Sequence, residues 1–294
     1  MKHTLLLSGI LLSVAACGGS STSDTDVDTT PEPVTDATAD IGLIDQVELH
    51  VLDCGTIEIS DLNDFSIAGD FAGETDINTN TCWLVRHPDG DLLWDTGLPG
   101  MLAGQPAFEQ DIYTVSLDTT LTQQLRDRGI SASEIEFVSI SHSAYDRVGQ
   151  VDQVSGATWL VHENEYAHMF PDNDENGETA TQFAAFATMK FEMFSEEKDV
   201  FGDGSVIIFP TPGHTPGHTS LEVHLPEFGP VLLTGDLYHR TESRELSSVP
   251  RLNTDEALTL ESMAAFEARA ERLGAKVVIQ NEMDDIAALP DVLR

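Results

Sequence analysis

The chain contains the stretch Thr211-Pro-Gly-His-Thr-Pro-Gly-His218, which follows an apolar run at Val206–Phe209. A second stretch, Ser139-Ile-Ser-His-Ser-Ala-Tyr-Asp-Arg-Val-Gly149, continues the apolar run Phe137–Ile140. A third, Leu233-Thr-Gly-Asp-Leu-Tyr-His239, ends another such run. In layered α/β folds the ends of strands hold polar side chains rigidly and bring them to one cleft. The three stretches therefore predict one polar site built from loops that are distant in sequence.

On both sides of these stretches, apolar runs alternate with polar segments, as in a globular domain. This pattern begins at about Val47 and continues to the C-terminus. Short apolar runs predict strands at Val47–Leu52, Cys82–Arg86, Leu92–Trp94, Phe137–Ile140, Thr158–Val161, Val206–Phe209, Leu221–Leu225, Val231–Thr234 and Lys276–Ile279. The segments between them predict helices at Leu121–Arg128, Glu163–Phe170 and Asp255–Leu273. Strands interspersed with helices predict a layered α/β architecture.

The order and spacing of these motifs resemble the metallo-β-lactamase superfamily over residues 46–294, and most of all its N-acyl homoserine lactonase-like hydrolases. Five shorter segments are also similar to that group: Asp53-Cys-Gly-Thr56, Trp83-Leu-Val-Arg-His-Pro88, Leu93-Trp-Asp-Thr-Gly97, Val249-Pro-Arg-Leu-Asn253 and Val278-Ile-Gln-Asn-Glu282. The resemblance implies that residues 46–294 form one α/β domain, an αββα four-layer sandwich of the metallo-β-lactamase type.

The resemblance also implies a set of metal ligands. The family usually binds two zinc ions through an H-x-H-x-D-H signature, a later His, a bridging Asp and a final His. His142 and Asp146 match the first His and the Asp of the signature, His214 matches the later His, and Asp236 matches the bridge.

Three of the expected ligands are replaced. Ala144 and Arg147 stand where the second and third signature histidines belong, and Asn281 stands where the final His belongs. The family pattern for the first ion is then reduced to His142, His214 and Asp236. Two imidazoles and a carboxylate still suffice for one divalent ion, with water at the open positions.

The second ion keeps only Asp146 and Asp236 among its expected ligands. Arg147 adds a permanent cation there, because guanidinium does not lose its proton in proteins. Like charges a few ångströms apart repel by several kcal/mol at an effective dielectric of about 20. We therefore expect at most one divalent metal ion, zinc first and manganese or iron as alternatives, or none.

Arg147 supports a further hypothesis. Losing a dication leaves buried carboxylates uncompensated, which is costly. A guanidinium between Asp146 and Asp236 restores the balance through charge-assisted hydrogen bonds. We predict that Arg147 replaces a metal ion structurally; the alternative is a surface arginine that follows a turn.

Two functions remain open at this point, and whether the chain is an enzyme stays uncertain. The first is a hydrolase of small-molecule lactones or esters with impaired or single-metal catalysis, in which Asp146 acts as base and Tyr238 or His239 donates to the substrate carbonyl. The second is a non-catalytic pseudoenzyme that uses the cleft to bind a ligand or partner. His218 is expected to pack within its loop rather than to bind metal.

The N-terminus predicts a lipid anchor. Residues 1–17 combine Lys2 with the apolar run Leu5–Ala16, which is too short to span a bilayer. The run ends Val14-Ala-Ala-Cys17 and resembles a bacterial lipobox, in which Cys17 becomes the lipidated residue; an ordinary secretory signal is the alternative. Residues 18–45 are an acidic, Ser- and Thr-rich tether of disordered composition. We expect attachment to the cell envelope, at the outer membrane facing the periplasm.

Charge excludes one class of partner. The chain has 51 acidic against 14 basic residues and a formal net charge of −37. Nucleic-acid binding needs a basic surface that releases counterions, and no stretch of this sequence provides one. The membrane contact that we expect is the lipid anchor alone.

Two further features stay undecided by the sequence. Cys54 and Cys82 either form a disulfide, which an oxidising envelope permits, or remain buried thiols. The acidic loop that begins at Asp172 has calcium-type spacing in its first half, but Phe183 stands where the closing Glu belongs. A solvated acidic loop is the preferred interpretation.

Overall fold

The computed structural model describes residues 46–171, 181 and 183–294. The predicted signal peptide with Cys17, the tether at 18–45 and the acidic loop that begins at Asp172 lie outside the described residues. Within the described part, no helix has both the length and the apolar character needed to cross a membrane.

The larger sheet contains nine strands in the described part of the chain. Their order is β4 (Phe108–Gln110), β5 (Tyr113–Ser116), β1 (Glu48–Ile59), β2 (Asp76–His87), β3 (Gly90–Trp94), β6 (Phe137–Ser139), β7 (Thr158–His162) and β8 (Lys190–Phe194), with β14 (Val292–Leu293) beside β1. The pairs from β4 to β3 are antiparallel, and those from β3 to β8 are parallel.

The smaller sheet has five described strands, in the order β13 (Lys276–Val278), β12 (Gly229–Leu233), β11 (Thr219–Leu225), β10 (Val206–Pro210) and β9 (Lys198–Asp199). The β12–β13 pair is parallel, and β11 is antiparallel to both β10 and β12. Strands β10, β12 and β13 therefore run in the same direction, so that the loops after them emerge at one edge of the sheet.

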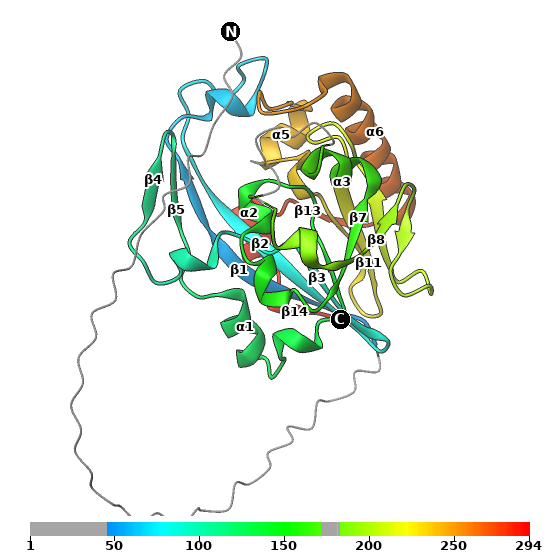
Figure 1. The fold of residues 1–294 in the computed structure, drawn as a ribbon. Coiled ribbons are helices and arrows are strands. Elements are labelled where there is room, and N and C mark those ends of the chain that lie inside the picture. The colour runs from blue at the N-terminus through cyan, green and yellow to red at the C-terminus, as the bar shows by residue number, and fades with distance from the viewer. Residues whose placement is uncertain (1–45, 172–180, 182) are drawn as a thin grey trace, which may run out of the picture. The chain divides into compact units, whose positions relative to one another are not determined.

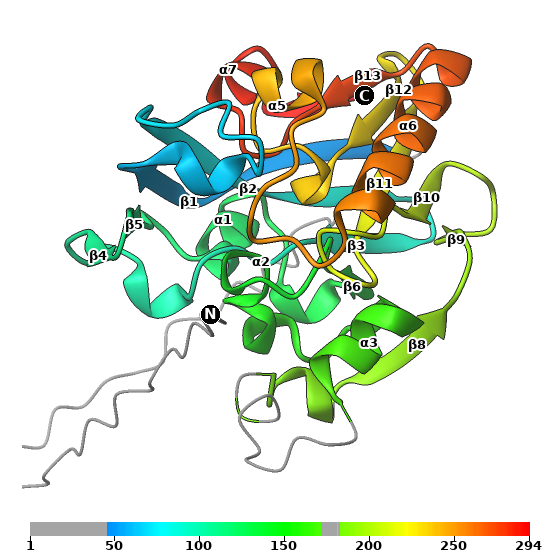
Figure 2. The same ribbon diagram turned by 90° about the horizontal axis from the view of Figure 1, so that it is seen from above.

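Helices flank the two sheets (Figure 1). The described α-helices are α1 (Leu121–Asp127), α2 (Tyr145–Val148), α3 (Glu163–Met169), α5 (Thr241–Leu246), α6 (Glu256–Leu273) and α7 (Met283–Ala287). Short 3-10 helices are η1 (Leu62–Phe65), η2 (Gly100–Leu102), η3 (Ala132–Glu134), η4 (Val151–Val154), η5 (Phe186–Thr188) and η6 (Gly235–Leu237). Figure 2 shows α3 and α6 on opposite sides of the strands.

Three hydrophobic cores separate four layers, which confirms the αββα sandwich. Side chains alternate faces along a strand, so Leu84 of β2 packs with α1 and α3, whereas Trp83 packs against the second sheet. The central core joins the inner faces of both sheets. The third core places Met263 and Phe266 of α6 on the outer face of the smaller sheet. Burial on both faces explains why these strands appear as continuous apolar runs.

The long helix and the cysteines illustrate what the sequence does and does not decide. Helix α6 begins at its Asp255 cap, which accepts a hydrogen bond from the backbone N–H of Leu258, and ends at Gly274 in the left-handed conformation. Both ends agree with the predicted helix. Cys54 and Cys82, left undecided by the sequence, form a disulfide between β1 and β2.

Candidate metal centre

The strand ends bring the three quoted stretches together. His142 follows β6, His214 follows β10, Asp236 follows β12, and Asn281 follows β13. The buried carboxylate of Glu165 in α3 joins two of these loops, because it accepts hydrogen bonds from the Ser143 backbone N–H at 2.7 Å and from the Thr215 hydroxyl at 2.7 Å. Glu165 therefore links the loops after β6 and β10 through hydrogen bonds of the protein itself.

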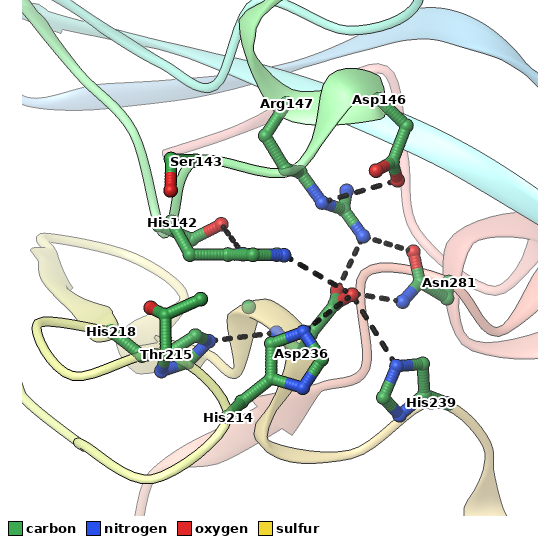
Figure 3. Close-up of polar contacts among 12 residues, drawn as sticks. His142, Ser143, Asp146, Arg147, His214, Thr215, His218, Asp236, His239 and Asn281 are labelled. Atoms are coloured by element: carbon green, nitrogen blue, oxygen red, sulfur yellow. Dashed lines mark hydrogen bonds and ion pairs between the residues drawn. The ribbon is translucent and has the colours of Figure 1, made fainter. Parts of the chain in front are cut away.

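Asp236 is the centre of the site (Figure 3), and its two carboxylate oxygens face different surroundings. Oδ1 accepts hydrogen bonds from Arg147 Nη2 at 2.5 Å and from Asn281 Nδ2 at 3.0 Å. Oδ2 lies 3.5 Å from His142 Nε2, 3.8 Å from His214 Nε2 and 3.3 Å from His239 Nε2. One oxygen is thus bound to a permanent cation, and the other is surrounded by imidazoles.

The hydrogen bonds of His142 determine which of its ring nitrogens carries the proton. The Ser141 hydroxyl donates to Asp95 Oδ2 at 3.1 Å, so its oxygen can accept from His142 Nδ1, also at 3.1 Å. That leaves Nε2 with a lone pair. Nε2 is buried and has no hydrogen-bond partner among the described residues. Burial lowers the pKa of His142 well below its ordinary value, so the ring is neutral.

His214 has the same electrostatic character as His142. Its burial lowers the pKa to about 3, so this ring is also neutral at physiological pH. Ligand atoms of His142, His214 and Asp236 all lie within 4.8 Å of one another. Zinc-bound atoms about 2 Å from the ion lie about 3.3 Å apart across a tetrahedron, so these three residues fit a divalent metal ion.

Arg147 occupies the position between the two acidic groups that the sequence analysis assigns to it. The side chain is fully buried, and its Nε lies 3.5 Å from Asp146 Oδ2. Its Nη1 donates to Asn80 Oδ1 at 2.8 Å, and its Nη2 donates to Asn281 Oδ1 at 2.6 Å. Arg147 is therefore not a surface arginine; its replacement of a metal ion stays a prediction.

The pKa values of the two aspartates differ because Arg147 contacts them differently. Burial raises the pKa of Asp146 above its ordinary value despite the guanidinium nearby. Burial also opposes ionisation of Asp236, but Arg147 together with His142 and His239 outweighs it, and these groups hold the pKa of that carboxyl well below its ordinary value. Burial raises the pKa of Asp95 to about 6. These three buried carboxylates against one guanidinium leave two negative charges when ionised, which is the charge that a divalent cation neutralises.

His218 holds the loops in place, as expected from the sequence. Its Nε2 accepts a hydrogen bond from the Asp236 backbone N–H at 2.9 Å, and its Nδ1 lies 2.9 Å from Thr211 Oγ1. Both ring nitrogens are engaged, so no lone pair remains for a metal ion. Burial lowers the pKa of His218 to about 4.

Two sequence-based assignments change in the structure. Tyr238 is buried beside Phe266, and its hydroxyl donates to Glu267 at 3.0 Å, so it faces away from the metal-binding group and the expected donor role is wrong for this residue. Asp146 was expected among the metal ligands, but it pairs with Arg147 instead. His239, by contrast, lies within the site.

Two residues that support the site, Asn80 and Phe65, are not predicted from the sequence. Asn80 in β2 is fully buried; it accepts from Arg147 and donates to the Asp146 backbone carbonyl at 2.8 Å. Phe65 packs edge-on against His239, with ring centroids 5.2 Å apart. Asn80 lies in a polar stretch of a strand, where its spacing from the metal-binding motifs carries no signal.

Comparisons with known proteins agree with this geometry. Residues 76–273 match the family model described as the metallo-beta-lactamase superfamily. The N-acyl homoserine lactonase AttM of Rhizobium johnstonii is 30% identical over 207 residues, which cover 67% of this chain and 79% of the relative. AttM of Azorhizobium caulinodans is 28% identical over 213 residues, which cover 69% of this chain and 81% of the relative.

Solved structures show the same fold. One is an N-acyl homoserine lactone hydrolase with the product N-hexanoyl-L-homoserine bound at its catalytic metal centre; the TM-score is 0.69 at 20% identity, over 83% of this chain and 96% of that one. Another is AidC, a dizinc quorum-quenching lactonase, with a TM-score of 0.61 at 18% identity, over 84% of this chain and 89% of that one. At these identities the likeness concerns the fold.

The buried cation can be tested by changing Arg147 to Met, which keeps an unbranched side chain and removes the charge. Leaving buried carboxylates without their partner lowers the free energy of unfolding by about 3 to 5 kcal/mol. Urea denaturation of the metal-free protein measures this loss. Adding Asp146→Asn to Arg147→Met is expected to recover at least about 0.5 kcal/mol, because it removes one of the unpaired charges.

Arg126→Met is the matched control, because Arg126 is exposed on α1 and its effect is expected to stay within about 0.5 kcal/mol. If Arg147→Met is no more destabilising than Arg126→Met, the guanidinium does not compensate the buried carboxylates.

Proposed function

The chain belongs to the metallo-β-lactamase superfamily, and we propose that it is a hydrolase of small, uncharged lactones or esters that works with a single divalent metal ion. The observation that supports this proposal most is the orientation of His142. Its Nε2 lone pair faces Asp236 Oδ2 at 3.5 Å. A lone pair and a carboxylate oxygen repel each other, and a cation between them turns that repulsion into binding.

His142, His214 and Asp236 would hold the ion. When bound, a divalent ion at such a site lowers the pKa of a coordinated water towards about 7 and polarises a carbonyl oxygen. The residues themselves supply the remaining requirements. The neutral imidazoles provide lone pairs, and Arg147 holds the Oδ1 side of Asp236, so that Oδ2 stays directed to the imidazoles.

Asp146 is the residue that we assign as proton acceptor. Its pKa is raised by burial, which moves the carboxyl towards the pH at which a general base is effective. Its side chain is 11% exposed, so water can reach it. The relatives that are named as N-acyl homoserine lactonases support the choice of a lactone substrate.

Charge favours an uncharged substrate over an anionic one. Asp146 and Asp236 both pair with Arg147, and the whole chain carries a net charge of −37. When a divalent ion neutralises the site, the charge of the chain still repels an anionic substrate, whereas a neutral lactone or ester meets no such repulsion. The same repulsion favours departure of a carboxylate product.

A metal count combined with an activity assay tests the proposal. The purified protein, supplied with zinc, is expected to bind about one ion per chain by mass spectrometry and to hydrolyse N-hexanoyl homoserine lactone or a neutral ester. His142→Ala and His214→Ala remove ligands, so both the ion and the activity are lost. His168→Ala is the matched control, because His168 is exposed on α3 and leaves both unchanged.

Two outcomes contradict the proposal. A protein with no ion and no turnover of lactones or esters is the non-catalytic binding protein that the sequence left open. Two ions per chain would show that Arg147 does not exclude the second one. Changing Ala144, Arg147 and Asn281 together to His is expected to raise metal uptake, and no rise would mean that the mapped ligand positions are wrong.

The envelope location is part of the proposal. It rests on the lipobox-like Val14-Ala-Ala-Cys17 and is supported by the Cys54–Cys82 disulfide, because disulfides persist mainly in oxidising compartments. Cys17→Ser is expected to abolish labelling by radioactive palmitate and to move the protein from the membrane to the soluble fraction. Ser20→Ala serves as control and should do neither. A Cys17→Ser protein that stays labelled and membrane-bound refutes the lipid anchor.

A further inference from the structure

We propose that Gln280 is a positioning residue of the metal site. Through Asp95 and Ser141, it fixes the tautomer of His142 that carries the ring proton on Nδ1 and leaves Nε2 free for an ion. The inference rests on the proposed single-metal function and adds to it the residues that prepare one ligand. Gln280 follows β13 and Asp95 follows β3, so this chain of contacts begins outside the loop that bears His142.

The side-chain amide of Gln280 can satisfy its neighbours in one orientation only. Its Oε1 accepts hydrogen bonds from the Trp94 indole N–H at 3.1 Å and from the Gly235 backbone N–H at 2.9 Å. Both of these groups are donors only, so the amide oxygen must face them and the NH2 group must face the other way. Nε2 then donates to Asp95 Oδ2 at 3.1 Å. Gln280 is fully buried, so solvent does not reach the amide.

Asp95 transmits this order of donors and acceptors to Ser141. Its Oδ1 accepts from the Ser141 backbone N–H at 2.6 Å, and its Oδ2 accepts from the Ser141 hydroxyl at 3.1 Å as well as from Gln280. Burial raises the pKa of Asp95 to about 6, so the carboxyl is ionised at pH 8. Because an ionised carboxylate only accepts hydrogen bonds, the Ser141 hydroxyl must donate to it.

The backbone holds these groups against one another. Asp95 has a φ of 61°, in the left-handed region that few non-glycine residues adopt. Such a conformation persists only where the surrounding structure fixes it. Gly235 also has a positive φ, and a Cβ added there would lie only 2.9 Å from the Cβ of Ser141. The loops after β3, β6 and β12 are therefore in close contact around the pair of Gln280 and Asp95.

Two neutral tautomers of His142 compete. A proton on Nδ1 can be donated to the Ser141 oxygen at 3.1 Å, because that hydroxyl gives its own proton to Asp95. A proton on Nε2 would face Asp236 Oδ2 at 3.5 Å and would occupy the lone pair that a metal ion needs. The fixed order of donors from Gln280 to Ser141 favours the first tautomer. A glutamine that is not itself a ligand thus determines whether His142 can bind an ion.

Exchanging the acid and the amide reverses the order of donors without changing the composition of the protein. In Asp95→Asn, the Ser141 backbone N–H keeps the amide oxygen beside it. The new NH2 group then faces the NH2 group of Gln280, and the protein loses stability towards urea. Adding Gln280→Glu gives that NH2 group an acceptor and restores the stability. In both variants residue 95 donates to the Ser141 hydroxyl, which donates to His142 Nδ1, so the ring proton moves to Nε2.

NMR of the whole, zinc-free chain labelled with ¹⁵N-histidine reports the tautomer at pH 8, because the chemical shift of a ring nitrogen shows whether it carries the proton. The unchanged protein is expected to have the proton of His142 on Nδ1, with the signals assigned by their loss in His142→Ala. The exchanged pair, Asp95→Asn with Gln280→Glu, is expected to have it on Nε2. Zinc binding by the exchanged pair, in competition with a chromophoric chelator, should be roughly 10- to 100-fold weaker, as for other losses of a group that supports a ligand.

Ser141→Ala interrupts the chain of contacts at its last step and is expected to move the ring proton of His142 to Nε2 as well. This variant decides the question even if the exchanged pair does not fold. Ser139→Ala is the matched control. Ser139 is equally buried in β6, but its hydroxyl donates to the Leu160 carbonyl at 2.8 Å, so the tautomer and the zinc affinity should stay unchanged.

The outcomes separate this inference from the proposed function. If the unchanged protein carries the His142 proton on Nε2, or if the exchanged pair and Ser141→Ala keep it on Nδ1, the inference is wrong. One bound ion and lactone hydrolysis would then still support the single-metal hydrolase. If the unchanged protein binds no zinc, the proposed function fails, and the NMR tautomers alone decide the inference. One bound ion, with a ring proton that moves in the exchanged pair but not in Ser139→Ala, supports both.

Discussion

The structure of this site depends on how one buried carboxylate is shared. Oδ1 of Asp236 accepts hydrogen bonds from a guanidinium and an amide, and Oδ2 faces imidazoles. A carboxylate in a low-dielectric interior needs compensation on both oxygens. Arg147 supplies it permanently on one side, because it cannot lose its proton. On the other side, Oδ2 and the imidazoles of His142 and His214 form a group that could hold a cation. Under the proposed function, a built-in charge and a single ion therefore divide this compensation between them.

This division has consequences for stability and for chemistry. A guanidinium that is hydrogen-bonded to Asn80, Asn281 and Asp236 keeps the loops together without metal, so the fold need not depend on metal supply. The same guanidinium offers no open coordination position and cannot activate water. Under the proposed function, catalysis belongs to the Oδ2 side, where Glu165 and His218 fix the loops and burial keeps the imidazoles of His142 and His214 neutral.

The sequence predicted the convergence of His142, His214 and Asp236, because each lies at the end of an apolar strand and strand ends meet at one edge. It also predicted a place for Arg147 between Asp146 and Asp236, from the family resemblance together with charge balance. It did not predict Asn80, since a buried polar residue in the middle of a strand has no local signature. Nor did it predict which of Tyr238 and His239 faces the site. The side to which each of these side chains points depends on where η6 ends, and packing decides that. The pairing of Cys54 with Cys82 depends on the register of β1 and β2, which the apolar pattern leaves open.

Diffraction at the zinc absorption edge, from crystals grown with zinc, tests the central claim most directly. The account predicts one anomalous peak, on the Oδ2 side of Asp236 among the imidazoles, with the Arg147 guanidinium still bound to Oδ1. A second peak beside Asp146, or an Arg147 side chain turned to solvent, would contradict it.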